Sequence, residues 1–291
     1  MRRAIHPTAH RPSSMETVMT RRPSLVLGLA FAATAALALS GCAGDTGSGS
    51  GSGDATAGDD YGLVEAGTLT VCSEVPYPPF EMEGGDNGSG YTGFDIDLTA
   101  AIADKLGLKL AVQDVSFDGL QSGTTLIAGT CDMGASAMTI TEERKANIDF
   151  SDPYYDSLQS LLTSVDSGIK GIGDLAGKNV GVQQGTTGES YATENAKGAT
   201  LVQYPGDAEL WPALQAGQIV AILQDQPVNV EHEKADSNYK IVEEYNTDEQ
   251  YGFAFAKGEK DALREAVNKA LEELRDSGDY QKIYDTYFSA K

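Results

Sequence analysis

The chain has 291 residues, of which 41% are hydrophobic and 22% charged, as is ordinary for a globular protein, and its length favours two domains or lobes. Its formal net charge is −22 at pH 7, and no basic stripe offsets this acidity, which argues against nucleic acid as a partner. The simplest interpretation of the charge is a solvated surface that keeps the protein soluble.

The N-terminal segment, residues 1–41, predicts a secretory signal. A basic start precedes an apolar run, residues 25–39, which is too short and too Ala-rich for a membrane span. Its ending, LSGC, resembles a bacterial lipobox, in which cleavage leaves Cys42 to carry diacylglycerol on the outer face of the cell membrane. The alternative is an ordinary signal with a chance cysteine. Translation can begin at Met1, Met15 or Met19.

Residues 42–60 are rich in Gly, Ser and Asp and predict a flexible tether, with order expected from Tyr61 onward. Strands and helices then alternate, which predicts a parallel sheet covered by helices. The expected elements are a strand at 67–74, a helix at 93–107, a strand at 108–115, a helix at 117–130 and a strand at 131–138.

A second α/β series of similar rhythm follows a turn-rich break. The expected elements are a short helix near Ile172, strands at 179–183, 199–205 and 219–225, helices after the Gly/Thr loop and at 207–218, a strand at 251–258 and two helices within 261–288. His232 is the only histidine after residue 41 and stands in a polar stretch, so we interpret it as a surface helix residue. A His-based metal site or a Ser-His-Asp triad is therefore not expected, and neither is a cofactor.

The first candidate site lies at the end of the strand expected at 131–138. Thr141 is suited to cap a helix, and Arg144 falls in the first turn of that helix, where a cation opposes the helix dipole. A functional demand explains this placement if Arg144 and the Thr139 hydroxyl hold a carboxylate. The alternative is a structural salt bridge from Arg144 to Glu142 or Asp149.

Two further candidates also follow strands, where open α/β sheets bind ligands. The loop QQGTTGES precedes a helix, and the N–H groups of Gly185, Thr186 and Thr187 are suited to an anion. Asp225 follows the strand at 219–225 and is suited to an ammonium group, although an Asp at a turn is equally common.

Aromatic residues follow the first two strands. Tyr77 and Phe117 are placed to flank a ligand side chain, Glu74 is placed to meet its polar tip, and Phe80 is expected in the core. An anion clamp, an ammonium acceptor and aromatic walls at strand ends together suit a free α-amino acid.

Several motifs give the chain a family resemblance. The segments YPPFE, GFDIDLTAAIADKLG, MTITEERKANIDFSDPYY, VGVQQGTTGES, AILQDQP and YGFAFAKG occur in the order seen in the polar amino acid-binding proteins of ABC importers, extracellular solute-binding protein family 3. The resemblance covers Thr68 to Phe288. It implies a type II, periplasmic-binding-protein-like α/β fold of two lobes with two hinge-crossing strands. Lobe 1 would be residues 61–155 plus 252–291, and lobe 2 residues 156–251.

The resemblance also implies roles for single residues. Arg144 and Thr139 would bind the α-carboxylate, Asp225 the α-ammonium, and Glu74, Tyr77 and Phe117 the side chain. The chain departs from many members at Ala137-Met138 before the TIT motif, with Ser136 just upstream, and at Gln183, where Lys or Arg is frequent. These departures affect the identity of the bound side chain, and Glu74 favours a polar or basic amino acid.

The expected function is a monomeric lipid-anchored receptor that captures an amino acid between its lobes and presents it to the permease subunits of an ABC importer. Two alternatives remain: a dehydratase of prephenate or arogenate type, with Glu74 or Glu81 as the acid, and a lipoprotein that signals to a membrane partner. Cys72 and Cys131 would lie on neighbouring strands of a sheet ordered 2-1-3, either as a disulfide or as two buried thiols.

Overall fold

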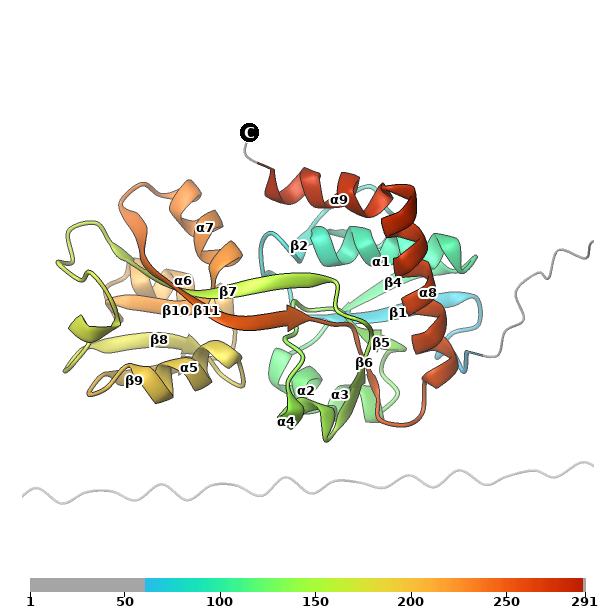
Figure 1. The fold of residues 1–291 in the computed structure, drawn as a ribbon, viewed down its shortest axis with the longest axis horizontal. Helices are drawn as coiled ribbons and strands as arrows, with labels where there is room; N and C mark the ends of the chain where they lie inside the picture. The colour runs from blue at the N-terminus through green and yellow to red at the C-terminus, as the bar shows by residue number, and fades with distance from the viewer. Residues whose placement is uncertain (1–60, 290–291) are drawn as a thin grey trace, which may run out of the picture. The chain divides into compact units, whose positions relative to one another are not determined.

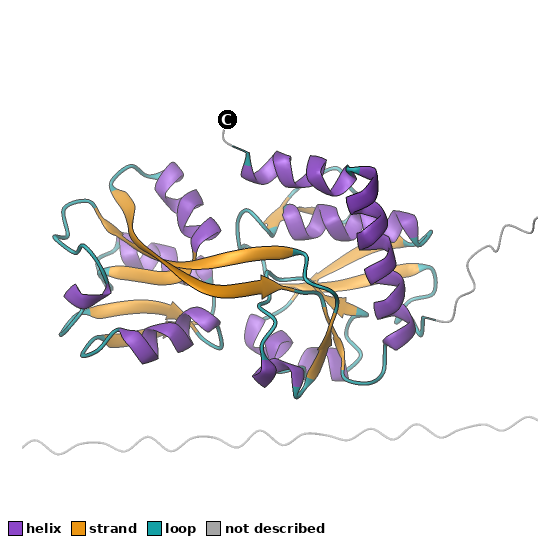
Figure 2. Cartoon of the chain, in the orientation of Figure 1, coloured by secondary structure: helices purple, strands orange, loops and turns teal. Residues whose placement is uncertain are grey.

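The computed structural model describes residues 61–289, which belong to one compact unit, Gly53–Lys291. This unit contains two five-stranded sheets with helices packed on them (Figure 2). The predicted α/β class is confirmed, and we call the part built on each sheet the first and the second lobe. The predicted signal segment, the predicted lipid site at Cys42 and the predicted tether fall in residues 1–60, outside the described residues.

The first sheet has the strand order β4-β1-β5-β12-β6. Strand β1 (Thr68–Ser73) pairs in parallel with β4 (Lys109–Asp114) on one side and with β5 (Met133–Gly134) on the other, which confirms the predicted 2-1-3 order. Strand β12 (Ala254–Ala256) runs antiparallel to β5 and to β6 (Ile148–Phe150), so the C-terminal part of the chain returns to this lobe.

The second sheet has the order β11-β7-β10-β8-β9. Strands β8 (Asn179–Gln183), β9 (Thr200–Tyr204) and β10 (Ala221–Asp225) are parallel, whereas β7 (Tyr155–Ser164) is antiparallel to β10. Strands β7 and β11 (Tyr239–Tyr251) form a long antiparallel pair that runs from the second lobe toward the first (Figure 1). A short hairpin, β2 (Met82–Glu83) and β3 (Tyr91–Thr92), completes the strands of the described region.

The core of the first lobe has helices on both faces of its sheet. Helix α1 (Phe94–Lys105) buries Phe94, Leu98 and Ile102, whose spacing of four residues places them on one face. Helices α8 (Asp261–Ser277) and α9 (Asp279–Phe288) pack against α1, with Gly278 in the left-handed conformation between them. The opposite face is covered by α2 (Phe117–Gln121) and α3 (Thr124–Ile127), which contribute Phe117, Leu120 and Leu126 to a separate cluster.

The helix and the strand expected between residues 117 and 138 are shorter than predicted. The helix expected at 117–130 is broken at Gly123, where φ is 82° and an added Cβ would meet the side chain of Ile148 at 2.8 Å. The strand expected at 131–138 pairs only at Met133 and Gly134. Beyond them the chain leaves the sheet, and Ala137 has φ 43°, a left-handed conformation that is incompatible with a strand.

The sheet of the second lobe has α5 (Thr187–Asn195) on one face and α6 (Asp207–Gln215) on the other, with α7 (Gln226–Ala235) packed on β7. Helix α4 (Glu142–Lys145) and the 3₁₀ turn Ile172–Asp174 are the remaining helical segments of the described residues.

The interpretation of His232 as a surface residue was wrong. The side chain is buried, its Nε2 lies 2.9 Å from Asp207 Oδ1, and its ring stacks on Trp211 at a centroid distance of 4.3 Å. Val228, four residues earlier on α7, is also fully buried, so both residues lie on the inner face of the helix. The polar residues around His232 concealed this face.

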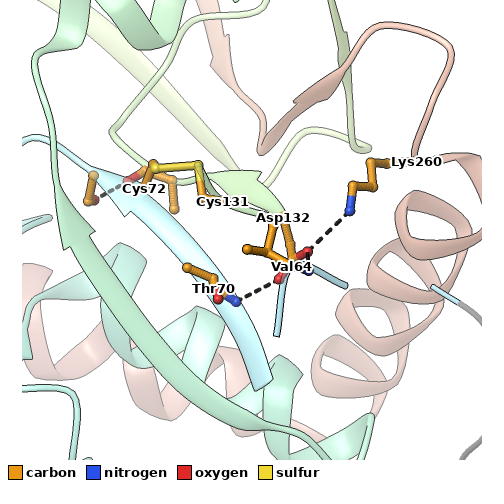
Figure 3. The surroundings of a disulfide bond; sticks show 8 residues. Val64, Thr70, Cys72, Cys131, Asp132 and Lys260 are labelled. Atoms are coloured by element: carbon orange, nitrogen blue, oxygen red, sulfur yellow. Dashed lines mark hydrogen bonds and ion pairs between the residues drawn. A yellow bond between two sulfur atoms is a disulfide. The ribbon is translucent and has the colours of Figure 1, made fainter. Parts of the chain in front are cut away.

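The structure joins Cys72 of β1 and Cys131, just before β5, in a disulfide (Figure 3). The next residue, Asp132, is fully buried; its Oδ1 accepts from Val64 N and pairs with Lys260, and its Oδ2 accepts from Thr70 N. Strands β1 and β5 are therefore linked by a covalent bond and by a buried carboxylate.

No helix in residues 61–289 is long and apolar enough to cross a membrane.

Candidate functional site

A narrow cavity lies between the two lobes. The first lobe contributes residues that follow β1 and β5 and residues of α2 and α4, and the second contributes residues at the ends of β8 and β10 and at the start of α5. All eleven predicted site residues line it: Glu74, Tyr77, Phe117, Ser136, Ala137, Thr139, Arg144, Gln183, Thr186, Thr187 and Asp225.

Arg144 is buried and makes no ion pair among the described residues. Its Nη1 donates to the carbonyl oxygen of Thr139 at 2.7 Å, its Nη2 donates to that of Gly185 at 3.0 Å, and its guanidinium lies over the Phe117 ring, 5.2 Å from the centroid. Burial lowers the pKa of Arg144 to about 10, so it stays charged at neutral pH. The guanidinium is thus held rigidly while its charge is not neutralised by a bonded acid, which suits it to an anionic ligand.

The alternative role of Arg144, a structural salt bridge, is wrong in both proposed forms. Glu142 pairs with Lys145 at 2.8 Å, and Asp149 pairs with Lys257 at 2.6 Å. The predicted cap is present, because Thr141 Oγ1 accepts from Arg144 N at 3.1 Å. The local sequence therefore builds α4 so that its one buried side chain, Arg144, points into the cavity.

Asp225 stands at the end of β10 and accepts hydrogen bonds from neutral groups. The hydroxyls of Tyr77 and Tyr251 donate to its Oδ2 at 2.9 Å and 2.6 Å, and Gln159 Nε2 donates to its Oδ1 at 2.5 Å. Burial and the charge of Glu249 raise the pKa of Asp225 to about 7, and the three hydrogen bonds limit the rise. A cation in the cavity would restore full ionisation of this carboxylate.

Tyr77 differs in role from the expected aromatic wall. Its ring is buried, and its hydroxyl reaches across to Asp225 of the second lobe. Burial raises the pKa of Tyr77 well above its usual value, so the phenol remains a donor. Phe80, predicted in the core, is fully buried and packs edge-on to Phe94 and Tyr155.

Glu74 lies at the rim of the cavity, half-buried and facing the second lobe. Gln183 Nε2 donates to Glu74 Oε2 at 2.5 Å and to the carbonyl of Pro205 at 3.2 Å. Burial raises the pKa of Glu74 to about 7 against this hydrogen bond, and three further carboxylates add to the rise: Asp207, Asp114 and Glu209. The same four acids line an adjoining cavity, so the mouth of the site is strongly acidic.

The Gly/Thr loop before α5 provides fewer free donors than predicted. Gly185 has φ 77°, and its N–H donates to Glu189 Oε2 at 2.8 Å, while Thr186 Oγ1 caps the helix by accepting from Glu189 N at 3.1 Å. Glu189 thus occupies the expected anion position at Gly185. The loop still contributes Thr186 and Thr187 to the cavity wall.

Sequence reasoning missed Glu249, which lies behind the cavity wall on β11. Its Oε2 accepts from the hydroxyls of Thr139 at 2.7 Å and Thr187 at 2.8 Å, and its Oε1 accepts from Thr247 at 2.8 Å. Gln159 Nε2 lies 3.2 Å from both oxygens. One carboxylate therefore connects a hydroxyl of each lobe to both long strands.

The bond to Glu249 also changes what Thr139 can offer. A hydroxyl has one proton, and in this structure Thr139 gives it to Glu249. Thr139 therefore presents lone pairs to the cavity, and the predicted donation to a ligand carboxylate requires the hydroxyl to change partner. Glu249 stands two residues before Tyr251 on the same buried face of β11, but the strand expected here began only at residue 251.

Two lobes linked by long strands around a cavity with opposite charges define a ligand-binding protein whose lobes enclose a small molecule. Comparison with known proteins gives the family. The chain belongs to the bacterial extracellular solute-binding proteins, family 3, whose model matches residues 69–290.

Individual relatives agree with this assignment. The chain is 34% identical to the L-cystine-binding protein TcyJ of Escherichia coli K12 over 238 residues, 79% of this chain and 88% of that protein. It is 32% identical to the arginine-binding extracellular protein ArtP of Bacillus subtilis 168 over 242 residues, 82% and 92% of the two chains. An ancestral arginine-binding protein bound to arginine matches with a TM-score of 0.70 and 41% identity, covering 77% of this chain and 99% of the other.

The buried carboxylates of the site predict a pH-dependent stability. The pKa of Asp225 is raised in the folded protein from 3.8 to about 7, so the folded state keeps a proton that the unfolded chain releases. Stability therefore falls as pH rises between these values, by on the order of 4 kcal/mol for this group. We expect Asp225→Asn to gain stability relative to the parent protein between pH 4 and pH 7, measured by urea unfolding.

The exposed Asp156 of β7 provides the control, because Asp156→Asn should leave the difference from the parent constant across the same pH range. A constant difference for Asp225→Asn as well would show that Asp225 is ionised in the folded protein at pH 4.

Proposed function

We propose that this chain is an extracytoplasmic receptor that binds a free basic amino acid between its lobes and delivers it to the permease of an ABC importer. The observation that carries the proposal is the pairing of Arg144, which lacks an acidic partner among the described residues, with Asp225, which lacks a cationic one, on the wall of one cavity. An α-carboxylate and an α-ammonium complement these two groups. The names of the relatives, which include a cystine-binding and an arginine-binding protein, support an amino acid as the ligand, and the arginine-binding relative supports a basic one.

The charge balance of the site supports a cationic side chain. Glu74 and Asp225 line the cavity and Glu249 lies directly behind it, against the single guanidinium of Arg144. A zwitterion leaves this excess of negative charge unchanged, whereas lysine or arginine reduces it. Glu74 is the group suited to the cationic tip, and Phe117 and Gln183 would flank the side chain. A neutral amide such as glutamine is the second candidate, because a protonated Glu74 can donate to an amide oxygen.

The lobe boundaries, the anchor and the oligomeric state belong to the same proposal. We assign residues 61–155 plus 252–291 to lobe 1 and residues 156–251 to lobe 2, so β7 and β11 cross between the lobes as a hinge. Cys42 would carry the lipid and residues 43–60 would span the distance to the membrane. The receptor acts as a monomer, and its side chains hold the ligand without a metal or cofactor.

A dehydratase is less well supported than a receptor. Glu81, one of the two acids considered for catalysis, is fully buried and does not line the cavity. Glu74 remains as an acid with a suitable pKa of about 7, but the relatives named above are binding proteins. Release of a product from prephenate or arogenate would support the enzyme, and unchanged substrate would contradict it.

A sensory lipoprotein would bind the same ligand and differ in its membrane partner.

The first prediction from this proposal concerns the ligand itself. We expect lysine or arginine at millimolar concentration to raise the melting temperature more than any other common amino acid, because a ligand bound only by the folded state stabilises it. Arg144→Ala should weaken binding by about 100-fold, since charge-assisted hydrogen bonds contribute about 1.5–3 kcal/mol each. Isothermal titration calorimetry measures this loss.

The neighbouring cation Lys145 is exposed, so Lys145→Ala is the matched control and should bind as the parent does. Equal losses in the two variants would show a general effect of positive charge. The absence of binding by any amino acid would contradict the proposed function.

The second prediction concerns Glu74 and pH. Any α-amino acid needs an ionised Asp225, and a cationic side chain also needs an ionised Glu74; the pKa of each group is about 7 in the free protein. As the pH falls from 7 to 5, each carboxyl group that must lose its proton before the ligand binds lowers the affinity by up to about tenfold per pH unit. The logarithm of the arginine affinity should therefore fall about twice as steeply as that of the glutamine affinity.

Glu74→Gln should reduce the arginine slope to that of glutamine. Glu83→Gln removes an exposed acid that does not line the cavity and should leave both slopes unchanged. If the logarithms of the arginine and glutamine affinities fall equally steeply with pH in the parent protein, Glu74 does not bind the cationic side chain.

The third prediction concerns the anchor. Cells that express the full chain and are fed an alkyne-labelled fatty acid should attach it to the protein, and Cys42→Ser should abolish the attachment and release the protein from the membrane fraction. Labelling that persists in Cys42→Ser would contradict the proposed lipid site.

A further inference from the structure

Two buried carboxyl groups face each other close to the cavity without any hydrogen-bond donor between them. Glu81 and Asp95 are both fully buried. Both oxygens of Glu81 and Oδ1 of Asp95 have no hydrogen-bond partner among the described residues, and the two carboxyl groups lie within hydrogen-bonding reach of each other. Two ionised carboxylates in this arrangement would repel each other in a region of low dielectric constant, with no counter-ion bonded to either. A single proton between them removes the repulsion and supplies the missing donor.

The surroundings decide which residue holds the proton. Asp95 Oδ2 accepts from the Tyr154 hydroxyl at 2.6 Å and from Ala137 N at 2.9 Å, and these bonds favour its charged form. Glu81 has no comparable donors, and its pKa is raised well above its usual value by burial and by the charge of Asp95, whereas that of Asp95 is raised only to about 6. Glu81 is therefore the neutral partner, which donates its O–H to the ionised Asp95.

Neither carboxyl group makes an ion pair among residues 61–289. The titratable groups with the main effects on Glu81 and Asp95 are acids and a phenol: Glu74 after β1, Asp225 at the end of β10, and Tyr154 before β7. Each acid adds negative charge, so an ionised Glu81 would have no compensating partner. A proton shared between the two carboxyl groups would neutralise one of them without a counter-ion.

The pair joins two segments that form the cavity wall of the first lobe. Tyr77 N donates to the backbone oxygen of Glu81 at 2.8 Å, and Glu81 N donates back to that of Tyr77 at 3.1 Å. On the other side, Asp95 accepts from the N–H of Ala137, whose φ of 43° is unfavourable for a residue other than glycine. Tyr77 and Ala137 both line the cavity, so one hydrogen bond between carboxyl groups fixes the distance between two binding segments.

We propose that Glu81 and Asp95 share one proton, and that this pair is a positioning device that holds the Tyr77 and Ala137 segments in the geometry needed for ligand binding. The part that concerns the ligand rests on the proposed function, whereas the proton and the geometry of Ala137 are properties of the ligand-free protein. The two parts are therefore tested separately.

The proton is tested by stability against pH with the full chain. A glutamic acid that stays neutral in the folded state lowers stability as pH rises above its unfolded pKa, by up to about tenfold in the ratio of folded to unfolded protein per pH unit. Glu81→Gln keeps the shape and donates an N–H to Asp95 without releasing a proton. We expect the unfolding equilibrium of Glu81→Gln to shift toward the folded state, relative to the parent, by at least about tenfold between pH 5 and pH 8.

The exposed Glu83 is two residues away, and Glu83→Gln is the matched control. Contributions from Glu74 and Asp225 are the same in the parent and in each variant, so they cancel in the comparison. A difference between Glu81→Gln and the parent that does not change with pH would overturn the shared proton.

The positioning role is tested by hydrogen exchange at the amide of Ala137 in the ligand-free protein. Glu81→Ala removes the donor to Asp95, and we expect the Ala137 amide to exchange at least about tenfold faster, with Glu81→Gln and Glu83→Ala close to the parent. Unchanged exchange in Glu81→Ala would overturn the positioning role, whatever the ligand.

Affinity then connects the device to binding. For the amino acid that binds most tightly to the parent, Glu81→Ala should weaken binding at least about tenfold through a faster dissociation rate, and Glu81→Gln should retain it within about threefold. Equal affinities in all variants would overturn the contribution to binding. Failure of every amino acid to bind would contradict the proposed function. The tests by amide exchange at Ala137 and by the pH dependence of stability would remain valid, because they use the ligand-free protein.

Discussion

The carboxylate of Asp225 is the point on which the site depends. It belongs to β10 of the second lobe, and its bonds reach Tyr77 of the first lobe, Gln159 of β7 and Tyr251 of β11. A buried carboxylate needs several donors, and here the donors come from both lobes and from both long strands. The donors are neutral, so the charge of Asp225 is left for a ligand. The same group therefore stabilises the contact between the lobes and keeps the affinity for a cation.

The sequence predicted the positions that line the cavity better than the bonds between them. Strand ends identify where side chains such as Asp225 and Arg144 must lie, because parallel strands end at one edge of a sheet. Hydrogen-bond partners depend on the packing of the lobes, which no local pattern contains. Tyr77 was expected as a wall and is a donor to Asp225, and Thr139 was expected to donate to a ligand and instead donates to Glu249.

The fold shows the same division. The rhythm of strands and helices gave the class of fold and the order of the first three strands of the first sheet, whereas Gly123 and Ala137 ended elements that their composition would have continued. His232 was misjudged because its neighbours in the sequence are polar, although its partners Trp211 and Asp207 are more than twenty residues away. Glu249 and Gln159 were missed because a polar residue on the buried face of a strand resembles, in sequence, one on the exposed face.

The disulfide between Cys72 and Cys131 has a consequence for when the protein can bind. Glu74 and Tyr77 follow Cys72 closely, and Ser136 to Arg144 follow Cys131, so every predicted binding residue of the first lobe except Phe117 is attached to the chain just beyond one of the two sulfurs. Reducing conditions such as those inside the cell keep the two cysteines as free thiols, whereas an extracellular setting permits the disulfide. In the proposed extracytoplasmic receptor, the two segments would therefore become covalently linked only after export, in the compartment where the ligand is captured.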